Sequence, residues 1–328
     1  MVDVLEALPV FGLLLALFLA AGWLFARVRM RRSRSPVRGL NYLLNEDPDP
    51  VPDADDATVE VTEATLDGHL ARASELRRRG DIDRALRLHQ HLLARPVLHG
   101  PARARVELEL ARDYLAAGLL NRAESLLAVL VQRDDALRRA ALEALLELHQ
   151  RERNWAAAAD AARELAAGGA ADVSRTLAHH LCELGEEARR RSDLTTARQL
   201  LAGALEQDPR CVRASLLSAR LEFAGGHYRD AAAACRRVHE QDPRFLPEVL
   251  PLLVAAHHEL GTDRDLLHFL ATAGVAAPAG ARAGHDAASR TGAYACDACG
   301  FSGPVLQWQC PACKTWGSIA PQAGRAED

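Results

Sequence analysis

The feature that most constrains the fold is a repeat of small residues along the middle of the chain. Gly or Ala recurs there in pairs twelve positions apart, and successive pairs are separated by 34 to 39 residues. This period is typical of tetratricopeptide repeats, whose two helices cross so closely that only small side chains fit at the crossing. The pairs are Ala73/Ala85, Ala111/Ala123, Gly185/Ala197 and Ala219/Ala231, with the looser pair Leu146/Ala158.

Turn-forming residues divide this region into hairpins, at 79–81, 117–119, 153–155, 191–193 and 225–227. Asp208-Pro209 and Asp242-Pro243 should each end a helix, because proline cannot continue one. We predict five helical hairpins within residues 67–274, and a sixth, less regular one from about Phe245 to Gly274. The alternative is a plain α-helical bundle with accidental spacing. Stacked hairpins form a superhelix whose concave face binds protein segments.

A four-cysteine pattern near the C-terminus carries the most specific chemical signal. Cys296/Cys299 and Cys310/Cys313 form two Cys-x-x-Cys pairs separated by ten residues. Each pair can aim both sulfurs at one point, and two facing turns complete a tetrahedron of thiolates around one iron or zinc ion. Gly300 suits a turn that needs a positive φ. The alternative is a pair of redox-active dithiols.

This metal ribbon, residues 293–319, is too small to fold on apolar burial alone, so metal binding should contribute most of its folding free energy. We expect four aromatic residues to form its miniature core: Tyr294, Phe301, Trp308 and Trp316. Replacing Cys310 with Ser should release the ion and unfold the ribbon while the repeats stay helical.

The N-terminus carries a predicted membrane anchor. Residues 7–26 form an uncharged run of twenty, long enough as a helix to cross the bilayer hydrocarbon. Acidic residues precede the run and five arginines follow it within residues 27–34, which is the reverse of a cleaved signal peptide, the alternative. The positive-inside rule then places the bulk of the chain in the cytoplasm of a single-pass protein.

The remaining segments are predicted to be the anchor region, a degenerate repeat, linkers and a tail. Residues 1–38 comprise the anchor and a basic juxtamembrane stretch, and residues 39–66 a degenerate first repeat with an acidic, proline-rich linker. Residues 275–292 are rich in Ala and Gly and form a flexible linker, and residues 320–328 a disordered tail.

Composition limits the chemistry. The net charge of −4 indicates no nucleic-acid partner, and no nucleophile elbow, phosphate loop or His-Glu-x-x-His motif is present, so the sequence does not support an enzyme. Six histidines on the predicted helices are expected at the surface or in the groove of the repeats: His89, His91, His179, His180, His257 and His258. The three cysteines outside the ribbon, Cys182, Cys211 and Cys235, are expected to be buried, reduced thiols.

Several stretches resemble the lipopolysaccharide assembly protein B (LapB/YciM) family. They are GLNYLLNE at 39–46, RGDIDRALRLHQ at 79–90, RDYLAAGLLNRAE at 112–124 and CGFSGPVLQWQCPACKTWG at 299–317. The family has further hairpins between its repeats and its ribbon, where this chain has residues 275–292. The position of the ribbon relative to the repeats therefore does not follow from the sequence.

The resemblance implies a bacterial inner-membrane adaptor that restrains lipopolysaccharide synthesis by presenting the lipid A pathway deacetylase to the membrane protease FtsH. It also implies a rubredoxin-like ribbon that packs on the repeats, with Cys296, Cys299, Cys310 and Cys313 as metal ligands. Two other functions stay open: a general envelope-assembly scaffold, and an iron-thiolate electron-transfer protein. A homodimer also stays open.

Overall fold

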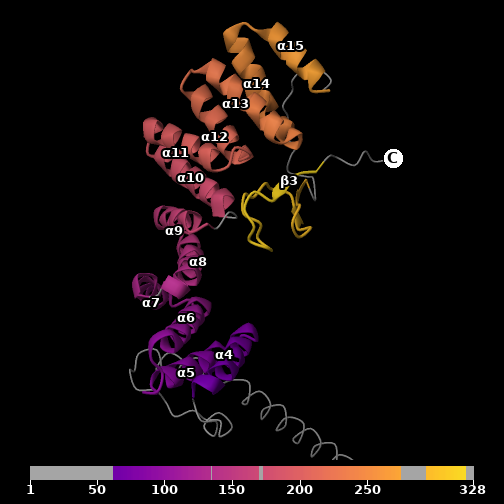
Figure 1. Cartoon of the computed structure of the whole chain (residues 1–328). Helices are drawn as coiled ribbons and strands as arrows, with labels where there is room; N and C mark the ends of the chain where they lie inside the picture. The colour runs from indigo at the N-terminus through magenta and orange to yellow at the C-terminus, as the bar shows by residue number, and fades with distance from the viewer. Residues whose placement is uncertain (1–61, 134, 170–172, 275–292, 323–328) are drawn as a thin grey trace, which may run out of the picture. The chain divides into compact units, whose positions relative to one another are not determined.

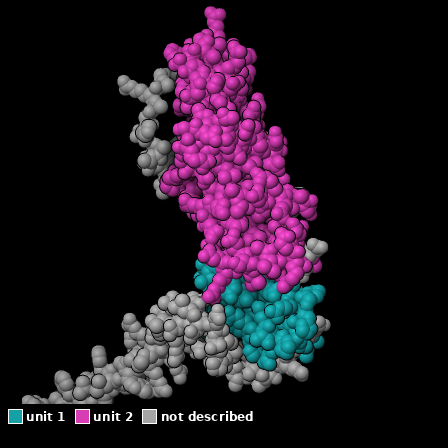
Figure 2. All heavy atoms as spheres, turned by 90° about the vertical axis from the view of Figure 1, so that its left-hand side faces the viewer, with its two compact units in different colours: residues 1–119 teal, residues 120–328 magenta. Residues whose placement is uncertain are grey.

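The computed structural model describes residues 62–133, 135–169, 173–274 and 293–322. These residues are mostly helical, with a small sheet near the C-terminus, as the sequence predicts. The chain divides into two compact units, residues 1–119 and 120–328, which Figure 2 colours separately. The predicted anchor at residues 7–26 and the linker at 275–292 lie outside the described residues. Within the described part, no helix is both long enough and apolar enough to cross a membrane.

Helices succeed one another in pairs at the predicted turns. The first unit contains α4 (Glu63–Arg78), α5 (Ile82–Leu93) and α6 (Gly100–Ala117). The second contains α7 (Leu120–Arg133), α8 (Asp135–Glu152), α9 (Trp155–Ala167), α10 (Val173–Arg190), α11 (Leu194–Gln207), α12 (Val212–Ala224), α13 (Tyr228–Gln241), the 3₁₀ turn η1 (Pro243–Phe245), α14 (Leu246–Leu260) and α15 (Asp263–Thr272). Helix α4 begins before residue 67, where the repeats were expected to start, because Thr62 caps it through the backbone N–H of Thr65.

The small residues of the repeat pattern are fully buried, which explains their spacing. All the alanines of the five pairs have 0% exposure: Ala73, Ala85, Ala111, Ala123, Ala158, Ala197, Ala219 and Ala231. In the pair formed by α10 and α11, a Cβ added to Gly185 would lie 3.2 Å from a methyl carbon of Leu201. Larger side chains at these positions would push apart the paired helices that lie within one unit.

One backbone conformation recurs at the hairpin turns. One or two residues after the first helix of a pair, a residue has a positive φ: Gly80, Gly118 and Gly226, and also Arg153 (56°) and Ser192 (63°). Glycine adopts this left-handed conformation without the steric cost that a Cβ brings. At the other end of two hairpins, helices α11 and α13 stop before Asp208-Pro209 and Asp242-Pro243, as predicted.

In the second unit, consecutive helices from α7 to α15 pack against one another. The first helices of successive hairpins also meet, α10 with α12 and α12 with α14, as expected for stacked tetratricopeptide hairpins. Two apolar clusters fill this unit, one around α10 and α11 and one around α13 and α14. The unit is therefore a continuous stack whose first helices share one face.

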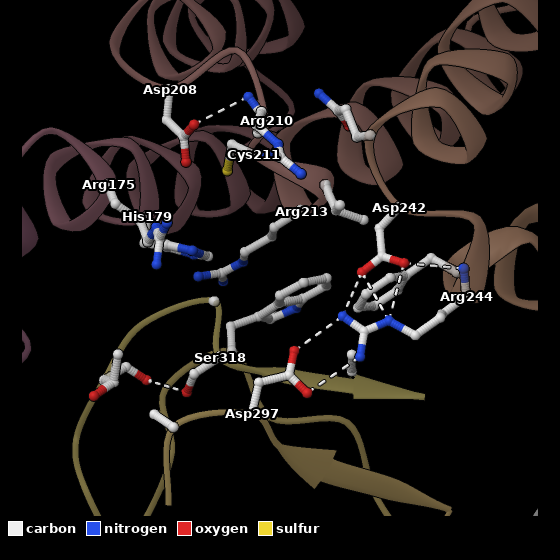
Figure 3. Close-up of a pocket in the computed structure, with 18 residues that line it drawn as sticks. Arg175, His179, Asp208, Arg210, Cys211, Arg213, Asp242, Arg244, Asp297 and Ser318 are labelled. Carbon is white, nitrogen blue, oxygen red and sulfur yellow. Dashed lines mark hydrogen bonds and ion pairs between the residues drawn. The ribbon is translucent and has the colours of Figure 1, made fainter. Parts of the chain in front are cut away.

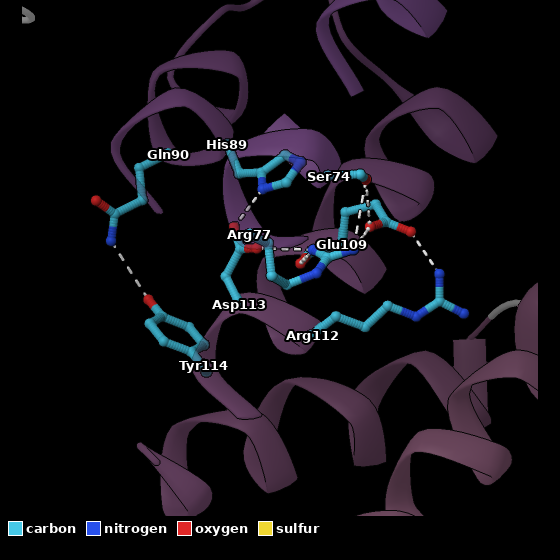
Figure 4. A network of polar contacts seen from close by, with 8 residues as sticks. All are labelled: Ser74, Arg77, His89, Gln90, Glu109, Arg112, Asp113 and Tyr114. Carbon is cyan, nitrogen blue, oxygen red and sulfur yellow. Dashed lines mark hydrogen bonds and ion pairs between the residues drawn. The ribbon is translucent and has the colours of Figure 1, made fainter. Parts of the chain in front are cut away.

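The first unit holds a buried polar network that joins its three helices (Figure 4). Arg77 of α4 donates to Asp113 and Glu109 of α6, both at 2.7 Å. His89 Nδ1 of α5 lies 2.5 Å from the other oxygen of Asp113, and both side chains have 0% exposure. Removing one partner of such a buried set typically costs about 3–5 kcal/mol, so the network fixes the arrangement of α4, α5 and α6.

The ribbon is a three-stranded antiparallel sheet in the order β2-β1-β3. Its strands are β1 (Tyr294–Cys296), β2 (Ser302–Gly303) and β3 (Ile319–Pro321). Strand β1 pairs with β2 through Tyr294 and Gly303, and with β3 through Cys296 and Ile319. The ribbon thus continues to Pro321, beyond its expected end at residue 319, because Ala320 is buried in strand β3.

Candidate metal centre and its docking surface

The four cysteine sulfurs of the ribbon converge on one point. Their Sγ atoms all lie within 4.8 Å of one another. Cys296 and Cys313 are separated by 3.7 Å, and Cys299 and Cys310 by 3.6 Å. Ligands about 2.3 Å from a tetrahedral ion lie about 3.8 Å apart, so these separations fit a single ion coordinated by four thiolates. They are far longer than the roughly 2.05 Å of a disulfide bond.

Two equivalent turns position these sulfurs. In the first, the N–H of Gly300 donates to the carbonyl of Cys296 (2.9 Å), and in the second Lys314 donates to Cys310 (2.9 Å). Both residues adopt the left-handed backbone conformation, with φ of 75° at Gly300 and 61° at Lys314. The sequence predicts this turn at Gly300 but gives no sign of it at Lys314. The second turn therefore holds a lysine in a conformation that favours glycine.

Hydrogen bonds around two of the four sulfurs, those of Cys296 and Cys313, favour the thiolate form. Ser318 Oγ lies 3.2 Å from Cys296 Sγ, and Thr315 Oγ1 lies 3.3 Å from Cys313 Sγ. The Ser318 hydroxyl is the largest cause that lowers the pKa of Cys296 to about 6, and the backbone N–H groups of Ala298 and Cys299 add to it. The Thr315 hydroxyl, with its backbone N–H, likewise lowers the pKa of Cys313. A metal ion requires this deprotonated form of cysteine.

The ribbon has a smaller core than the sequence suggests. Cys296, Cys310 and Ile319 are buried together, and Tyr294 and Phe301 pack against them as predicted. The prediction that Trp308 and Trp316 complete this core is wrong. Both indole rings instead contact the helical repeats, because so small a module has no interior large enough to bury them.

Trp316 anchors the ribbon on α9 and α10. It stacks on His179 with ring centroids 5.3 Å apart and planes 24° apart. It meets Trp155 and His180 edge-on, at 6.0 and 5.6 Å. Trp316 is only 6% exposed, so nearly the whole indole is removed from water. The adjacent Gly317 lies so close that an added Cβ would be 2.6 Å from His179 Nε2.

Trp308 forms a second aromatic contact farther along the stack. Its ring is parallel to that of Phe245 in η1, at 5.8 Å and 12°. The guanidinium carbon of Arg213, on α12, lies 5.8 Å from the centre of the same ring. Ala320 of β3 joins the apolar cluster that contains Phe245. The ribbon therefore extends the core of the last hairpins.

Polar contacts at the edge of this interface set its register. Arg244 donates to both oxygens of Asp297, at 3.1 and 2.9 Å. The hydroxyl of Tyr294 donates to Glu248 of α14; burial, followed by this hydrogen bond, raises the pKa of Tyr294 to about 12. Gln309 donates to Gln150 of α8 at 3.4 Å.

The docking contacts share one face of the second unit. The first helices of four successive hairpins, α8, α10, α12 and α14, all contribute a side chain to the ribbon: Gln150, His179, Arg213 and Glu248. Figure 1 shows the ribbon alongside this stack. The ribbon occupies part of the face that tetratricopeptide arrays use for protein segments.

Four of the six histidines that were predicted at the surface or in the groove are buried, whereas His91 is half-buried and His258 is exposed. His179 and His180 lie under the ribbon, at 3% and 0% exposure, and His89 and His257 are also buried in the helices. Within the described residues, the four-cysteine cluster is the one group with the geometry of a metal site, and none of these histidines belongs to it. The three other cysteines are buried free thiols, as predicted: Cys182, Cys211 and Cys235.

Sequence reasoning missed the docking residues, which are Trp308, Trp316, His179, Arg213 and Arg244. One signal could have indicated them. A ribbon with two tryptophans beside its second pair of cysteines carries more aromatic surface than so short a module can bury. Those rings needed a partner surface, and adjacent His179 and His180 provide it.

Comparisons with known proteins agree with this architecture. Residues 294–321 match the family model described as a rubredoxin metal binding domain, and residues 188–256 match a tetratricopeptide repeat model. The prediction of one iron or zinc ion bound by four cysteines is thereby confirmed together with the convergence of the four sulfurs.

Relatives match over nearly the whole chain. Lipopolysaccharide assembly protein B of Escherichia coli (strain K12) is 28% identical over 381 residues, covering 95% of this chain and 97% of the relative. The Haemophilus influenzae protein of the same name is 28% identical, covering 94% and 97%. The first alignment is longer than the 328 residues of this chain, so the relative contains segments that this chain lacks. The predicted resemblance to this family is confirmed.

Two solved structures are similar to part of this chain. A crystal structure of MamA protein has a TM-score of 0.39 and 21% identity, covering 55% of this chain and 93% of MamA. A tetratricopeptide repeat protein from Parabacteroides merdae has a TM-score of 0.40 and 15% identity, covering 64% and 78%.

Proposed function

We propose that this chain is an inner-membrane-tethered adaptor that regulates lipopolysaccharide synthesis. It presents the deacetylase of the lipid A pathway to the membrane protease FtsH, and it is not itself an enzyme. The observation that carries the proposal is a likeness to lipopolysaccharide assembly protein B that covers 95% of the chain. The protein partners are those that the family resemblance implies.

The docked ribbon supports an adaptor over a redox protein. Its metal site stabilises a small module, and the two tryptophans of this module contact helices α9 and α10 and the turn η1. In this role Cys296, Cys299, Cys310 and Cys313 act as ligands of a structural ion. The ion then contributes by holding a recognition surface in shape.

The proposed anchor, residues 7–26, adds a concentration effect. A single membrane-spanning helix with the bulk of the chain in the cytoplasm confines the adaptor and its client near a membrane-bound protease. Deletion of residues 1–26 should leave a folded protein that no longer restrains lipopolysaccharide synthesis. Full activity of the truncated form would contradict the tethering argument.

Co-purification tests the partner assignment. The full chain, extracted in mild detergent, should retain both the protease and the deacetylase. A variant that carries Trp316→Ala keeps the anchor and loses the docked ribbon, so it separates partners held by the docked surface from proteins that merely share the membrane. Recovery of many envelope proteins without this pair would favour a general assembly scaffold.

A further inference from the structure

We propose that the seam between the ribbon and the repeats binds an anion that carries a phosphate group, either a soluble phosphate or the headgroup of a lipid. A cleft of about 430 Å³ opens at this seam (Figure 3). Its walls come from α10, the turn before α12 and the start of that helix, the region of η1, and both halves of the ribbon. Four arginines line it, Arg175, Arg210, Arg213 and Arg244.

Arg213 carries buried hydrogen-bond donors that an anion would accept. The residue is 6% exposed, and its Nη2 donates to Glu183 at 2.9 Å. Its Nε and Nη1 are buried and have no acceptor among the residues that the structure describes. The guanidinium carbon lies 5.8 Å from the centre of the Trp308 ring, a cation–π contact that supplies no oxygen acceptor for these N–H groups. A buried donor without an acceptor is destabilising, and a bound oxyanion would accept these N–H groups.

The cleft contains arginine side chains that are not hydrogen-bonded to a carboxylate. Arg244 is already neutralised, because it bonds to both Asp242 and Asp297. The guanidiniums of Arg175 and Arg210 are exposed and have no hydrogen-bond acceptor within the described part of the chain. The remaining carboxylate of the lining, Asp208, accepts the backbone N–H of Arg210. Arg213 is paired with Glu183, so Arg175 and Arg210 are the lining arginines that have no hydrogen bond to a carboxylate, and Arg210 also lies near Asp242.

Two further groups favour an anion. Helix α12 begins beside the cleft at Val212, and its N-cap residue, Cys211, makes no side-chain hydrogen bond to the helix. The N-terminus of a helix of this length carries partial positive charge and N–H groups directed outward. The Nδ1 atom of His179, which also lines the cleft, is buried without a partner in the described residues.

The arrangement suits phosphate better than a carboxylate. Guanidinium groups bind either anion through paired N–H donors. A carboxylate offers two oxygens, whereas a terminal phosphate offers three to donors that approach from α10, α12 and the turn before α12. The cleft is also larger than one phosphate, which leaves room for the group that the phosphate is attached to.

Binding here would strengthen ribbon docking. Arg175 and Arg210 belong to the repeats, whereas Ser318 and Thr315 belong to the ribbon, and all four line the same cleft. A ligand that touches both sides binds the docked state alone, so its binding free energy adds to the stability of docking. This consequence holds whether or not the proposed partners are correct.

The test is calorimetric titration of the full chain in neutral detergent with two probes, inorganic phosphate and dihexanoyl phosphatidic acid. Dihexanoyl phosphatidylcholine serves as the neutral-headgroup control. Saturable binding at one site is expected, and Arg175→Gln and Arg210→Gln should each weaken it roughly tenfold, since a hydrogen bond to a charged group is worth about that factor or more. Both side chains are exposed, so helical circular dichroism and metal content should be unchanged.

Arg220→Gln is the matched control, because Arg220 is an exposed arginine of the neighbouring helix α12 that does not line the cleft. The affinity of the Arg220→Gln variant for the probes should equal that of the unaltered chain. Binding of phosphatidic acid alone identifies a lipid source, and binding of inorganic phosphate identifies a soluble one. The proposal is overturned if neither probe saturates, or if Arg220→Gln weakens binding as much as Arg210→Gln.

Discussion

Trp316 of the ribbon and His179 of α10 form a stacked pair, with ring centroids 5.3 Å apart. The pair joins a module stabilised by metal to a stack of helices stabilised by apolar burial. Since nearly all of the indole is buried, this contact contributes more to docking than any polar contact at the rim.

Trp316→Ala should therefore release the ribbon without unfolding it. Truncating a buried tryptophan typically costs about 3–5 kcal/mol. Undocking would expose His179 and His180, so their modification by diethyl pyrocarbonate, followed by mass spectrometry, should rise strongly while the metal content stays the same. Asp297→Asn is the control, because its ion pair with the half-exposed Arg244 is worth about 1 kcal/mol or less. Equal reactivity in both variants would mean that charge, not aromatic burial, holds the ribbon.

Acid should weaken the same interface. Burial, and then the nearby Arg213, lowers the pKa of His179 to about 3, and the same two causes lower that of His180 to about 4. In the unfolded chain both titrate near 6.5, so below that pH the unfolded state binds protons that the folded state does not. Stability is thus complete above about pH 6.5 and falls as the pH drops toward the folded values.

At pH 5.5 the loss should be about 1.4 kcal/mol for each histidine, measured by urea unfolding. His179→Gln removes one of the two contributions, and comparison with the unaltered chain cancels the acid release of metal that both proteins share. Parallel pH profiles for the two proteins would contradict the assignment.

Cys310→Ser should abolish stoichiometric metal binding. Cys310 is fully buried at the centre of the cluster, and three thiolates cannot complete the tetrahedron. Because the ion supplies most of the folding free energy of so small a module, the ribbon should unfold while the helical circular dichroism of the repeats persists. Cys235→Ser, which alters a buried thiol of α13 away from the cluster, should keep the metal. Full metal content in Cys310→Ser would show that the ion lies elsewhere.

Ser192→Gly should stabilise the second unit by about 0.5–1 kcal/mol. Ser192 has a φ of 63° in the turn between α10 and α11, where a Cβ costs about 1–2 kcal/mol. Glycine removes this cost, but its greater conformational freedom in the unfolded chain offsets part of the stabilisation. Urea unfolding measures the change. The reverse substitution, Gly226→Ser in the turn between α12 and α13, should lower stability by a similar amount. A loss of stability in Ser192→Gly would indicate an unrecognised role for the hydroxyl.

The repeats were predictable because their determinants are local. Small residues at the helix crossings and glycines in the turns recur at a fixed period, and the structure buries the former and gives the latter a positive φ. The left-handed turns at Arg153 and Ser192 were not predictable, since neither residue prefers that conformation. The clustering of the four cysteines followed from their spacing alone.

Docking was not predictable because it depends on surfaces far apart in sequence. Nothing near Trp316 indicates that its partner is His179, and nothing near Arg213 indicates that Trp308 covers it. Both pairs arise only after the hairpins have stacked and brought α10 and α12 beneath the ribbon. Trp308 and Trp316, which the sequence places in an independent core of the ribbon, therefore lie at its interface with the repeats.

The adaptor account is tested most directly by the half-life of the lipid A pathway deacetylase in cells from which this protein is depleted. After protein synthesis is stopped, the account predicts that the deacetylase becomes several-fold longer-lived than in undepleted cells, and that the unaltered chain restores its turnover whereas the Trp316→Ala variant does not. An unchanged deacetylase half-life on depletion would contradict the account.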